Sequence, residues 1–456
     1  MLRVGIDDLD EGYFAQQATR VLHGQIPYRD FDSLYTPGLL YLHAGLFALL
    51  GGPSLIVLRV VALAGRIGMV GLTYALTCSL ARPRWALAAA VFPLIGLDTA
   101  PERWETHPAW LSTALALLGV YVFPRWAVAT GVIAGLAFVF KQNTGVFLLG
   151  AALAWTWLTR ASGHAWLGRA ARLLAGFAMV TLVWLVPLVV AVDGQIGRLS
   201  AFVGGVNQAA LFVPPEFMDL LPVTAGGLGA WYLWRRCPHP RLAWYVLAGA
   251  FLFLTEFPRM DAVHLVWSGP MLLVVGAIAL DGLSTQAGVL ALTALVLASL
   301  QIVTGRAAFL REATQPVGVR FAEDLRAPPR TGEELRSLVG EIQSRTAPDE
   351  PIFVYPTSPL LYVVAERPNP TRYDHFYPGA APPFEVQRAI DELADVRLVV
   401  ISDYWTFFFG TGGDNAPLDA YLAENYQEVA RFGAYHVLER PILAHVFGAE
   451  SAGRRD

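Results

Sequence analysis

Four carboxylates stand close together in the segment DDLDEG near the start of the chain: Asp7, Asp8, Asp10 and Glu11. Such charges repel one another unless a metal ion or a basic ligand lies among them, so the cluster suits metal binding or general-base chemistry. The plainer alternative is a solvated acidic segment that caps the following helix and complements its dipole. Both alternatives place the carboxylates at the start of a helix.

The segment FVFKQNTG contains Lys141, the only lysine of the chain. It stands at the end of an apolar run in a sequence whose other basic residues are all arginines. An ammonium group there can pair with a phosphate as a point charge, or it can extend from a helix end toward water. The spacing leaves both alternatives open.

A short link between two apolar runs, EFPRMDAVH, holds Glu256, Arg259, Asp261 and His264. Ionisable groups at this depth are costly unless they face a polar cavity, so the link is a second candidate site. A solvated turn with an Arg–Asp pair is the alternative. The loop LDTAPERWETHP adds further polar side chains, namely Asp98, Glu102, Arg103, Glu105 and His107.

The elements that position these residues belong in a bilayer. Of the 456 residues, 55% are hydrophobic and only 15% are charged, against about a quarter in soluble domains. Apolar runs that could cross the membrane are predicted at 57–80, 85–97, 108–122, 127–140, 145–159, 172–192, 217–234, 242–256, 264–280 and 287–303. The shorter runs need flanking residues to reach the ~20 residues of a full span.

Arginines concentrate in alternate short loops, which the positive-inside tendency assigns to the cytoplasm. They are Arg82, Arg84, Arg125, Arg160, Arg169, Arg172, Arg235, Arg236 and Arg241. With ten spans, the remaining loops share the outer face with everything after residue 304. All three polar clusters then fall on that face.

Outside the predicted membrane domain (57–303) we expect two further parts. Residues 1–56 form an outer loop with two interfacial helices, one in YFAQQATRVLHG and one in PGLLYLHAGLFALLGG. Residues 304–456 form an extracytoplasmic α/β domain, with strands at 351–356, 396–403 and 435–440 and helices at 333–344, 384–394 and 416–430. In the first membrane run, Arg59 can extend outward to the surface.

Composition and missing motifs exclude several functions. A net charge of −4 gives no positive field for nucleic acid. Cys78 and Cys237 offer neither a disulfide framework nor metal-ligand spacing. A Walker-type phosphate loop, a GxSxG elbow and an HExxH pair are absent, so ATP-driven transport and the common membrane hydrolases lose support.

The run DEGYFAQQATRVLHGQIPYRDFDSLYTPGLLYLHAGLFALLG, followed by LRVVALAGR, resembles the first outer loop of the GT-C superfamily of membrane glycosyltransferases. It is most similar to bacterial relatives of dolichyl-phosphate-mannose protein mannosyltransferases and of the lipid A aminoarabinose transferase. GLAFVFKQNTG and FPRMDAVHL resemble further motifs of that group. The resemblance covers most of residues 8–303. Family members usually have a first span before the acidic motif, whereas this chain starts a few residues before it, which suggests a misplaced start or a lost helix.

The resemblance implies a multi-pass hexosyl or pentosyl transferase with a GT-C-like fold. It would move a sugar from a polyprenyl-phosphate carrier to a lipid, glycan or protein acceptor on the outer face of the cytoplasmic membrane, inverting the anomeric centre. Asp10 would be the catalytic base, and Glu11 would support it or help to hold a metal. Lys141 and Arg259 are candidates for the carrier phosphate. Further substrate-binding candidates are His264, Arg103 and Asp261, and candidate ligands of a divalent metal ion are Asp8, Asp10 and Glu102.

Two other functions fit the same composition. A membrane transporter could line a pathway with intramembrane arginines, but it would place polar residues near the midplane and repeat its architecture in two halves. A catalytically inactive lipid-binding scaffold would keep the fold without needing Asp10. The clustering of polar residues on one face favours the glycosyltransferase.

Overall fold

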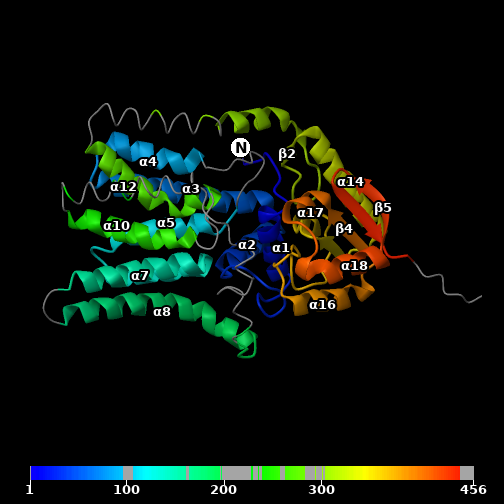
Figure 1. Cartoon of the computed structure of the whole chain (residues 1–456), viewed down its shortest axis with the longest axis horizontal. Helices are drawn as coiled ribbons and strands as arrows, with labels where there is room; N and C mark the ends of the chain where they lie inside the picture. Colours follow the sequence, from blue (N-terminus) through cyan, green and yellow to red (C-terminus); the bar gives the residue numbers. More distant parts are fainter. Residues whose placement is uncertain are drawn as a thin grey trace, which may run out of the picture.

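A computed structural model describes residues 2–95, 106–160, 164–195, 239–256, 262–282 and 303–441, with single residues at 197, 227, 229, 235, 293 and 300. A bundle of apolar helices occupies one end of the molecule and a mixed α/β part the other (Figure 1). Between them lie two N-terminal helices, α1 (Asp10–Leu22) and α2 (Gly38–Leu50). Both confirm the helices predicted in residues 1–56.

The bundle is built from the predicted apolar runs. Its helices are α3 (Leu55–Cys78), α4 (Pro83–Ile95), α5 (Ala109–Val122), α6 (Ala127–Phe140), α7 (Gln142–Leu158), α8 (Ala165–Ala191), α10 (Pro240–Phe253), α11 (Ala262–Ser268) and α12 (Pro270–Asp281). The predicted run 264–280 is divided between α11 and α12. The runs 217–234 and 287–303 lie almost wholly outside the described residues.

The apolar helices differ in length. Among the described residues, α3 and α8 are long and apolar enough to cross a membrane, whereas α2, α5, α6, α10 and α12 are apolar but shorter. A helix rises about 1.5 Å per residue, so the shorter ones do not reach across a ~30 Å hydrocarbon layer by themselves. Ten spans therefore stay a prediction.

Glycines set the closest helix crossings of the bundle. A Cβ atom on Gly131 of α6 would collide with the Leu173 carbonyl of α8, and one on Gly176 of α8 would collide with the Val128 carbonyl of α6. Small residues where two apolar helices cross allow their backbones to touch. Gly145 of α7 meets the backbone of α6 in the same way, at Ala134. These contacts hold α6 against α8 and against α7.

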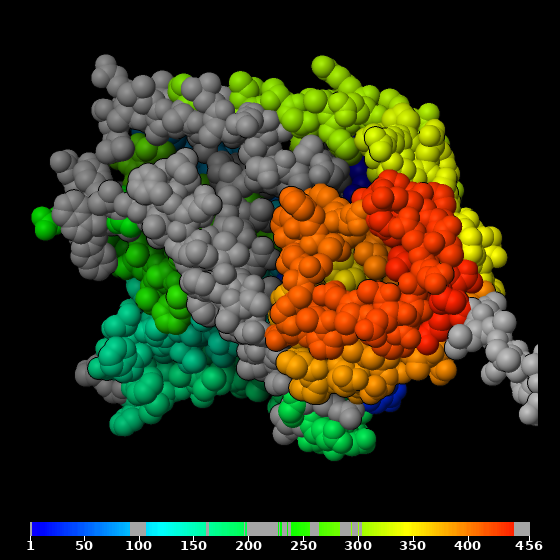
Figure 2. Space-filling view, turned by 45° about the vertical axis from the view of Figure 1, so that its right-hand side comes forward, coloured from blue at the N-terminus to red at the C-terminus, as the bar shows by residue number. Residues whose placement is uncertain are grey.

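The C-terminal part contains a four-stranded sheet with the order β3 (Ile352–Tyr355), β4 (Leu398–Ser402), β6 (Tyr435–Glu439), β5 (Gln427–Phe432). β3 and β4 run parallel, and the other neighbours are antiparallel. Helices α14 (Pro329–Arg345), α15 (Leu360–Val364), α16 (Pro383–Glu392), α17 (Asp403–Phe409) and α18 (Ala416–Asn425) surround it, and a small ribbon pairs β1 (Gln315–Pro316) with β2 (Arg326–Ala327). Figure 2 shows these residues as one body, yellow to red, beside the bundle.

The sheet confirms the strands predicted at 351–356, 396–403 and 435–440. The helix predicted over 416–430 is wrong in its second half, because α18 ends at Asn425 and residues 427–432 form β5. This strand is largely exposed and rich in polar residues, so it lacks the apolar run that marks β3 and β4. Its pairing with β6, not its own sequence, holds it extended.

One hydrophobic core joins the two ends of the sequence. Phe14 and Phe47 from the N-terminal helices share it with Leu58 of α3 and with Leu361 and Val400 of the C-terminal part. The outer loop is thus packed into the C-terminal domain and onto the bundle at once. The boundaries at residues 56 and 303 stay predictions.

Candidate active site

The start of α1 is fixed by its own carboxylates. The backbone amides of Leu9 and Asp10 donate hydrogen bonds to Oδ1 of Asp7, at 3.1 and 3.2 Å. Asp10 and Glu11 occupy the first turn, where negative charge interacts favourably with the helix dipole. Asp10 is half-buried there. The capping alternative is therefore part of what the acidic segment does, and it sets the position of Asp10.

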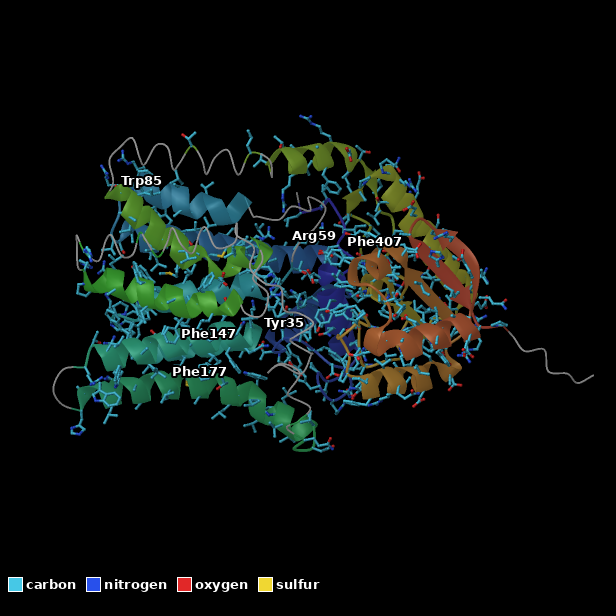
Figure 3. All side chains as sticks on the ribbon, in the orientation of Figure 1. Tyr35, Arg59, Trp85, Phe147, Phe177 and Phe407 are labelled. Atoms are coloured by element: carbon cyan, nitrogen blue, oxygen red, sulfur yellow. The ribbon has the colours of Figure 1, made fainter. Side chains whose placement is uncertain are left out.

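Glu11 is tied to the bundle through Arg59 of α3. Nε and Nη2 of Arg59 donate to Oε1 and Oε2 of Glu11 at 2.6 and 2.7 Å, and both side chains are fully buried. Arg59 also donates to the backbone carbonyls of Leu2 and Gly5, each at 2.8 Å. Burial raises the pKa of the Glu11 carboxyl, and the charge of Arg59 opposes the rise. Arg59 does not extend outward, because its guanidinium pairs with buried Glu11. Figure 3 labels Arg59 where α3 meets the N-terminal helices.

Gly12, the third residue of the DEG triplet, lets α1 touch the C-terminal part. A Cβ atom at Gly12 would lie 2.5 Å from the backbone nitrogen of Leu360 and 2.7 Å from its Cβ. No larger residue fits between α1 and α15. The triplet therefore contacts α3 through one residue and α15 through the next.

Asp8 extends the same connection to the sheet. Its Oδ2 accepts hydrogen bonds from the hydroxyl of Ser358, from Nε1 of Trp405 at 3.0 Å and from the hydroxyl of Tyr435 at 2.7 Å. Trp405 lies on α17 and Tyr435 begins β6. Predicted as a metal ligand, Asp8 has this oxygen engaged with the C-terminal part.

Lys141 stands at a one-residue break between α6 and α7, where its backbone is extended. The outer loop holds this break: the hydroxyl of Thr36 donates to the carbonyl of Phe138 at 2.6 Å, and Nε2 of Gln142 donates to the carbonyl of Leu34 at 3.2 Å. Gly38 allows the start of α2 to pack directly against Val139. The LYTPG and KQNTG segments thus position each other.

A column of rings leads from α1 to Lys141. The ring centroids of Phe14 and His107 are 6.0 Å apart, and His107 stacks on Trp267 at 4.2 Å with an interplanar angle of 7°. Nζ of Lys141, which is buried, lies 5.4 Å from the centroid of the Trp267 ring. Phe14 follows Asp10 by four residues and shares its helix face. Each step of the path from α1 to the ammonium is therefore a direct ring contact.

His107 has a defined tautomer in this column. The backbone amide of Ala109 donates to its Nδ1 at 3.1 Å, so Nδ1 carries no proton, and Nε2 donates to the hydroxyl of Tyr35 at 2.7 Å. His264 of α11 packs its ring against the edge of Trp267, with centroids 5.2 Å apart. His107 and His264 are thus joined by one indole.

Comparisons of sequence give no relative: no protein-family model matches the chain, and no curated protein matches it. Two kinds of solved structure match the chain in fold. ArnT from Cupriavidus metallidurans bound to undecaprenyl phosphate superposes with a TM-score of 0.59 at 14% identity, covering 96% of this chain and 94% of that one. Its apo state gives 0.56 at 16% identity over the same shares. The chain has the GT-C glycosyltransferase fold.

A second GT-C structure supports this result from another domain of life. The apo oligosaccharyltransferase of Archaeoglobus fulgidus superposes with a TM-score of 0.54 at 12% identity, covering 93% of this chain and 69% of the archaeal one. The bundle and the C-terminal part of the present chain thus together follow a GT-C architecture. At these identities the likeness concerns the fold.

The structure describes only some of the predicted site residues. Asp10, Glu11 and Asp8 lie at the start of α1, and Lys141 and His264 meet at Trp267. The remaining predicted residues lie outside the described residues: Glu102, Arg103, Arg259 and Asp261. Sequence reasoning named His107 among the polar residues of its loop without giving it a role, and it did not select Tyr35 or Trp267. The available signal was the clustering of His107 with charged residues in its loop and the spacing of Trp267 three residues after His264.

Proposed function

We propose that the chain transfers a sugar from a polyprenyl-phosphate carrier to a lipid, glycan or protein acceptor at the outer face of the cytoplasmic membrane, with inversion. The GT-C fold supports this proposal, as does the undecaprenyl phosphate bound by the C. metallidurans ArnT. The transferred group would be a hexosyl or a pentosyl unit. Membrane lipid would surround the bundle, and the acidic motif and the C-terminal part would lie on the outer side.

One observation carries the proposal. The first turn of α1 is held by Arg59 of the bundle at Glu11, by Leu360 at Gly12 and by the C-terminal part at Asp8. Asp10 is therefore kept where the apolar bundle meets the outer part, as a positioned catalytic group must be. The ring column beginning at Phe14 connects this face of α1 to a buried ammonium group.

In the proposed reaction Asp10 accepts the proton of the acceptor hydroxyl. The hydroxyl oxygen forms a bond to the anomeric carbon, the bond between that carbon and the phosphate oxygen breaks, and the electron pair leaves with the polyprenyl phosphate. Attack from the side opposite the leaving group inverts the centre. A sugar hydroxyl is a weak nucleophile near pH 7, and a positioned base of this kind contributes about 10²- to 10⁴-fold.

The leaving phosphate gains charge and needs a cation in a poorly hydrated place. Lys141 is proposed for this role, because it is buried at the end of α6 beside Trp267. Arg259 would be its partner, and His264, Arg103 and Asp261 would contact the phosphate or the sugar. Glu11 acts through Arg59 by fixing α1, and is thus a positioning residue.

A divalent metal held by Asp8, Asp10 and Glu102 stays a prediction. Among the described residues there is no group of three His, Cys, Asp or Glu side chains that could hold a metal ion. Asp8 already has one oxygen occupied by three donors. No step of the proposed reaction depends on a metal.

The test is transfer by the purified protein in lipid nanodiscs, with radiolabelled undecaprenyl-phosphate sugars as donors and envelope lipids and glycans as acceptors. Asp10→Asn should lower the transfer rate at least about 10²-fold while the unfolding midpoint stays that of the wild type. Asp349→Asn, which changes an exposed carboxylate of the C-terminal part, is the matched control and should keep the rate.

Three outcomes would contradict the proposal. Asp10→Asn with undiminished transfer would remove the proposed base. Donor binding without turnover, unaffected by Asp10→Asn, would favour a lipid-binding scaffold. Movement of labelled lipid or sugar across sealed vesicles, with no glycosidic product, would favour a transporter.

A further inference from the structure

A cavity of about 590 Å³ lies beside the C-terminal half of α1. Its walls come from α1 at Gln16 and Thr19, from the α2–α3 turn at Gly51–Pro53, from residues 320–321 and from the segment after α15. Thr19 follows Asp10 by about two and a half helical turns, so it lies on the opposite face of α1. The cavity is therefore separate from the proposed reaction centre, and its volume is that of a small-molecule site.

The buried cations around the cavity are already occupied. Nε of Arg20 donates to Oε1 of Gln25 at 2.6 Å and its Nη1 to the Thr371 carbonyl at 3.0 Å. Nε of Arg367 donates to the hydroxyl of Thr346 at 2.7 Å, and both of its other nitrogens donate to backbone carbonyls. These guanidinium groups offer little to a phosphate or carboxylate, because their N–H groups point to the protein. The cavity is thus suited to an uncharged ligand.

Uncharged polar groups face the cavity instead. Gln16 is only 4% exposed, and its amide makes no hydrogen bond within the described part of the chain. His23 is exposed at the end of α1. Among the described residues, Gln25 uses only its oxygen in a side-chain hydrogen bond, which it accepts from Arg20. An amide supplies both a donor and an acceptor, which is the pair of functions that a sugar hydroxyl also has. The Gln16 side chain lines the cavity, so the hydroxyl groups of a bound ligand can satisfy its amide.

A strained aromatic wall completes the cavity. Phe321 and Glu366 have φ angles of 67° and 55°, in the left-handed region that side chains other than glycine rarely adopt. Arg320 joins them: its Nη1 donates to Oε2 of Glu366 at 2.5 Å, and its Cζ lies 4.9 Å from the Phe321 ring centroid. Strain of this kind persists where the surroundings fix it, often at ligand sites. Here it keeps the Phe321 ring at the cavity, close to Gly52.

We propose that this cavity binds a neutral sugar residue of the acceptor, one remote from the hydroxyl that receives the transferred sugar. This inference rests on the proposed function, because it assigns the acceptor to the glycans and glycolipids. The amide of Gln16 would hydrogen-bond the hydroxyl groups, and the apolar face of the sugar ring would pack against Phe321. A second contact of this kind holds a long acceptor in one direction across α1.

The test measures binding apart from turnover. Saturation-transfer NMR is recorded on the full-length protein in detergent with a panel of neutral probes: glucose, galactose, mannose, N-acetylglucosamine and their disaccharides. At least one probe should bind. Gln16→Leu, which removes the amide, and Phe321→Gly, which removes the ring and suits the positive φ, should each weaken that binding at least tenfold. Their unfolding midpoints show whether each variant has folded.

The matched controls are Gln387→Leu and Phe384→Ala, both on the exposed face of α16, and both should bind the probe like the wild type. Asp10→Asn should also bind it like the wild type. Failure of the whole panel, or binding that neither cavity variant weakens, would overturn the sugar site. Binding of inorganic phosphate that competes with the sugar would overturn it as well. Sugar binding without transfer from any donor would contradict the proposed function and still support the sugar site.

Discussion

Arg59 donates hydrogen bonds to both carboxylate oxygens of Glu11, from Nε to Oε1 at 2.6 Å and from Nη2 to Oε2 at 2.7 Å. Neither side chain is exposed to solvent. Glu11→Gln would leave the buried guanidinium without its counter-charge, which typically costs about 3–5 kcal/mol. We therefore expect a large fall in the unfolding midpoint, measured by tryptophan fluorescence in detergent. Glu334→Gln, in the exposed Arg330–Glu334 pair, should leave the midpoint unchanged. A Glu11→Gln protein as stable as the wild type would contradict the structural role of the pair.

Gly12 should tolerate no side chain. Gly12→Ala places a methyl group within 2.5–2.9 Å of Leu360, so α1 and α15 must separate, at a cost of about 1–3 kcal/mol or more. Gly45→Ala in α2 is the matched control, because no atom lies within 4 Å of the added carbon and alanine favours the helix. The unfolding midpoint should fall for the first variant and hold or rise for the second. Equal midpoints would mean that α1 and α15 are not in tight contact.

Lys141, as the only lysine, gives a spectroscopic probe of the donor site. Protein labelled with lysine enriched in ¹³C at Cε should give one lysine signal, and undecaprenyl phosphate should shift it. The physical reason is the approach of a phosphate to the ammonium beside Trp267. Farnesol, which has an isoprenoid chain but no phosphate, is the control and should not shift the signal. If undecaprenyl phosphate does not shift the signal, the proposal that Lys141 binds the carrier phosphate is wrong.

The edge of the sheet should respond to pH through His436. Its Nε2 lies 2.6 Å from Oδ2 of Asp403, and its Nδ1 lies 2.7 Å from Oε2 of Glu428. Partial burial by itself lowers the pKa of His436, but the two hydrogen bonds outweigh it and the net pKa is raised above 6.5. The stabilisation is therefore complete below about pH 6.5 and is lost as the pH rises through the folded-state pKa.

Hydrogen exchange of β5 and β6, corrected for intrinsic rates, measures this effect. Protection should be greater at pH 6 than at pH 8, and His436→Gln should remove the difference. Asp403→Asn should reduce it, since one of the two acceptors then carries no charge. Equal protection of the wild type at both pH values would refute the role of His436.

The sequence predicted those parts of the fold that depend on local pattern. Periodic apolar residues located α1 and α2, continuous apolar runs located β3 and β4, and the shorter pattern YHVLER located β6. β5 was not predictable, because its polar residues give no strand signal without β6 beside them. The crossings of α6, α7 and α8 depend on glycines whose neighbours are known only in three dimensions.

The residues of the candidate site could be predicted by type, but the partner of each residue could not. Acidic clustering pointed to Asp10 and Glu11, but the sequence could not indicate that Glu11 pairs with Arg59 across 48 positions. Nor could it indicate that Asp8 binds Trp405, because the partners are far apart in the chain. His107 joins the site by stacking on Trp267, and a stacking contact leaves no periodic signal in the sequence.

The bond from Tyr435 to Asp8 spans 427 positions of the sequence. The ribosome adds Tyr435 to the chain 427 positions after Asp8, so the surroundings of α1 are complete only after this whole stretch has been synthesised. Contacts of such high order are slow to form, and the exposed intermediate is prone to misassembly. A nascent chain that stops before Tyr435 would contain every residue of the acidic motif. It would still lack the hydroxyl group that binds Asp8. We therefore expect the proposed reaction centre to assemble only after β6 has been synthesised.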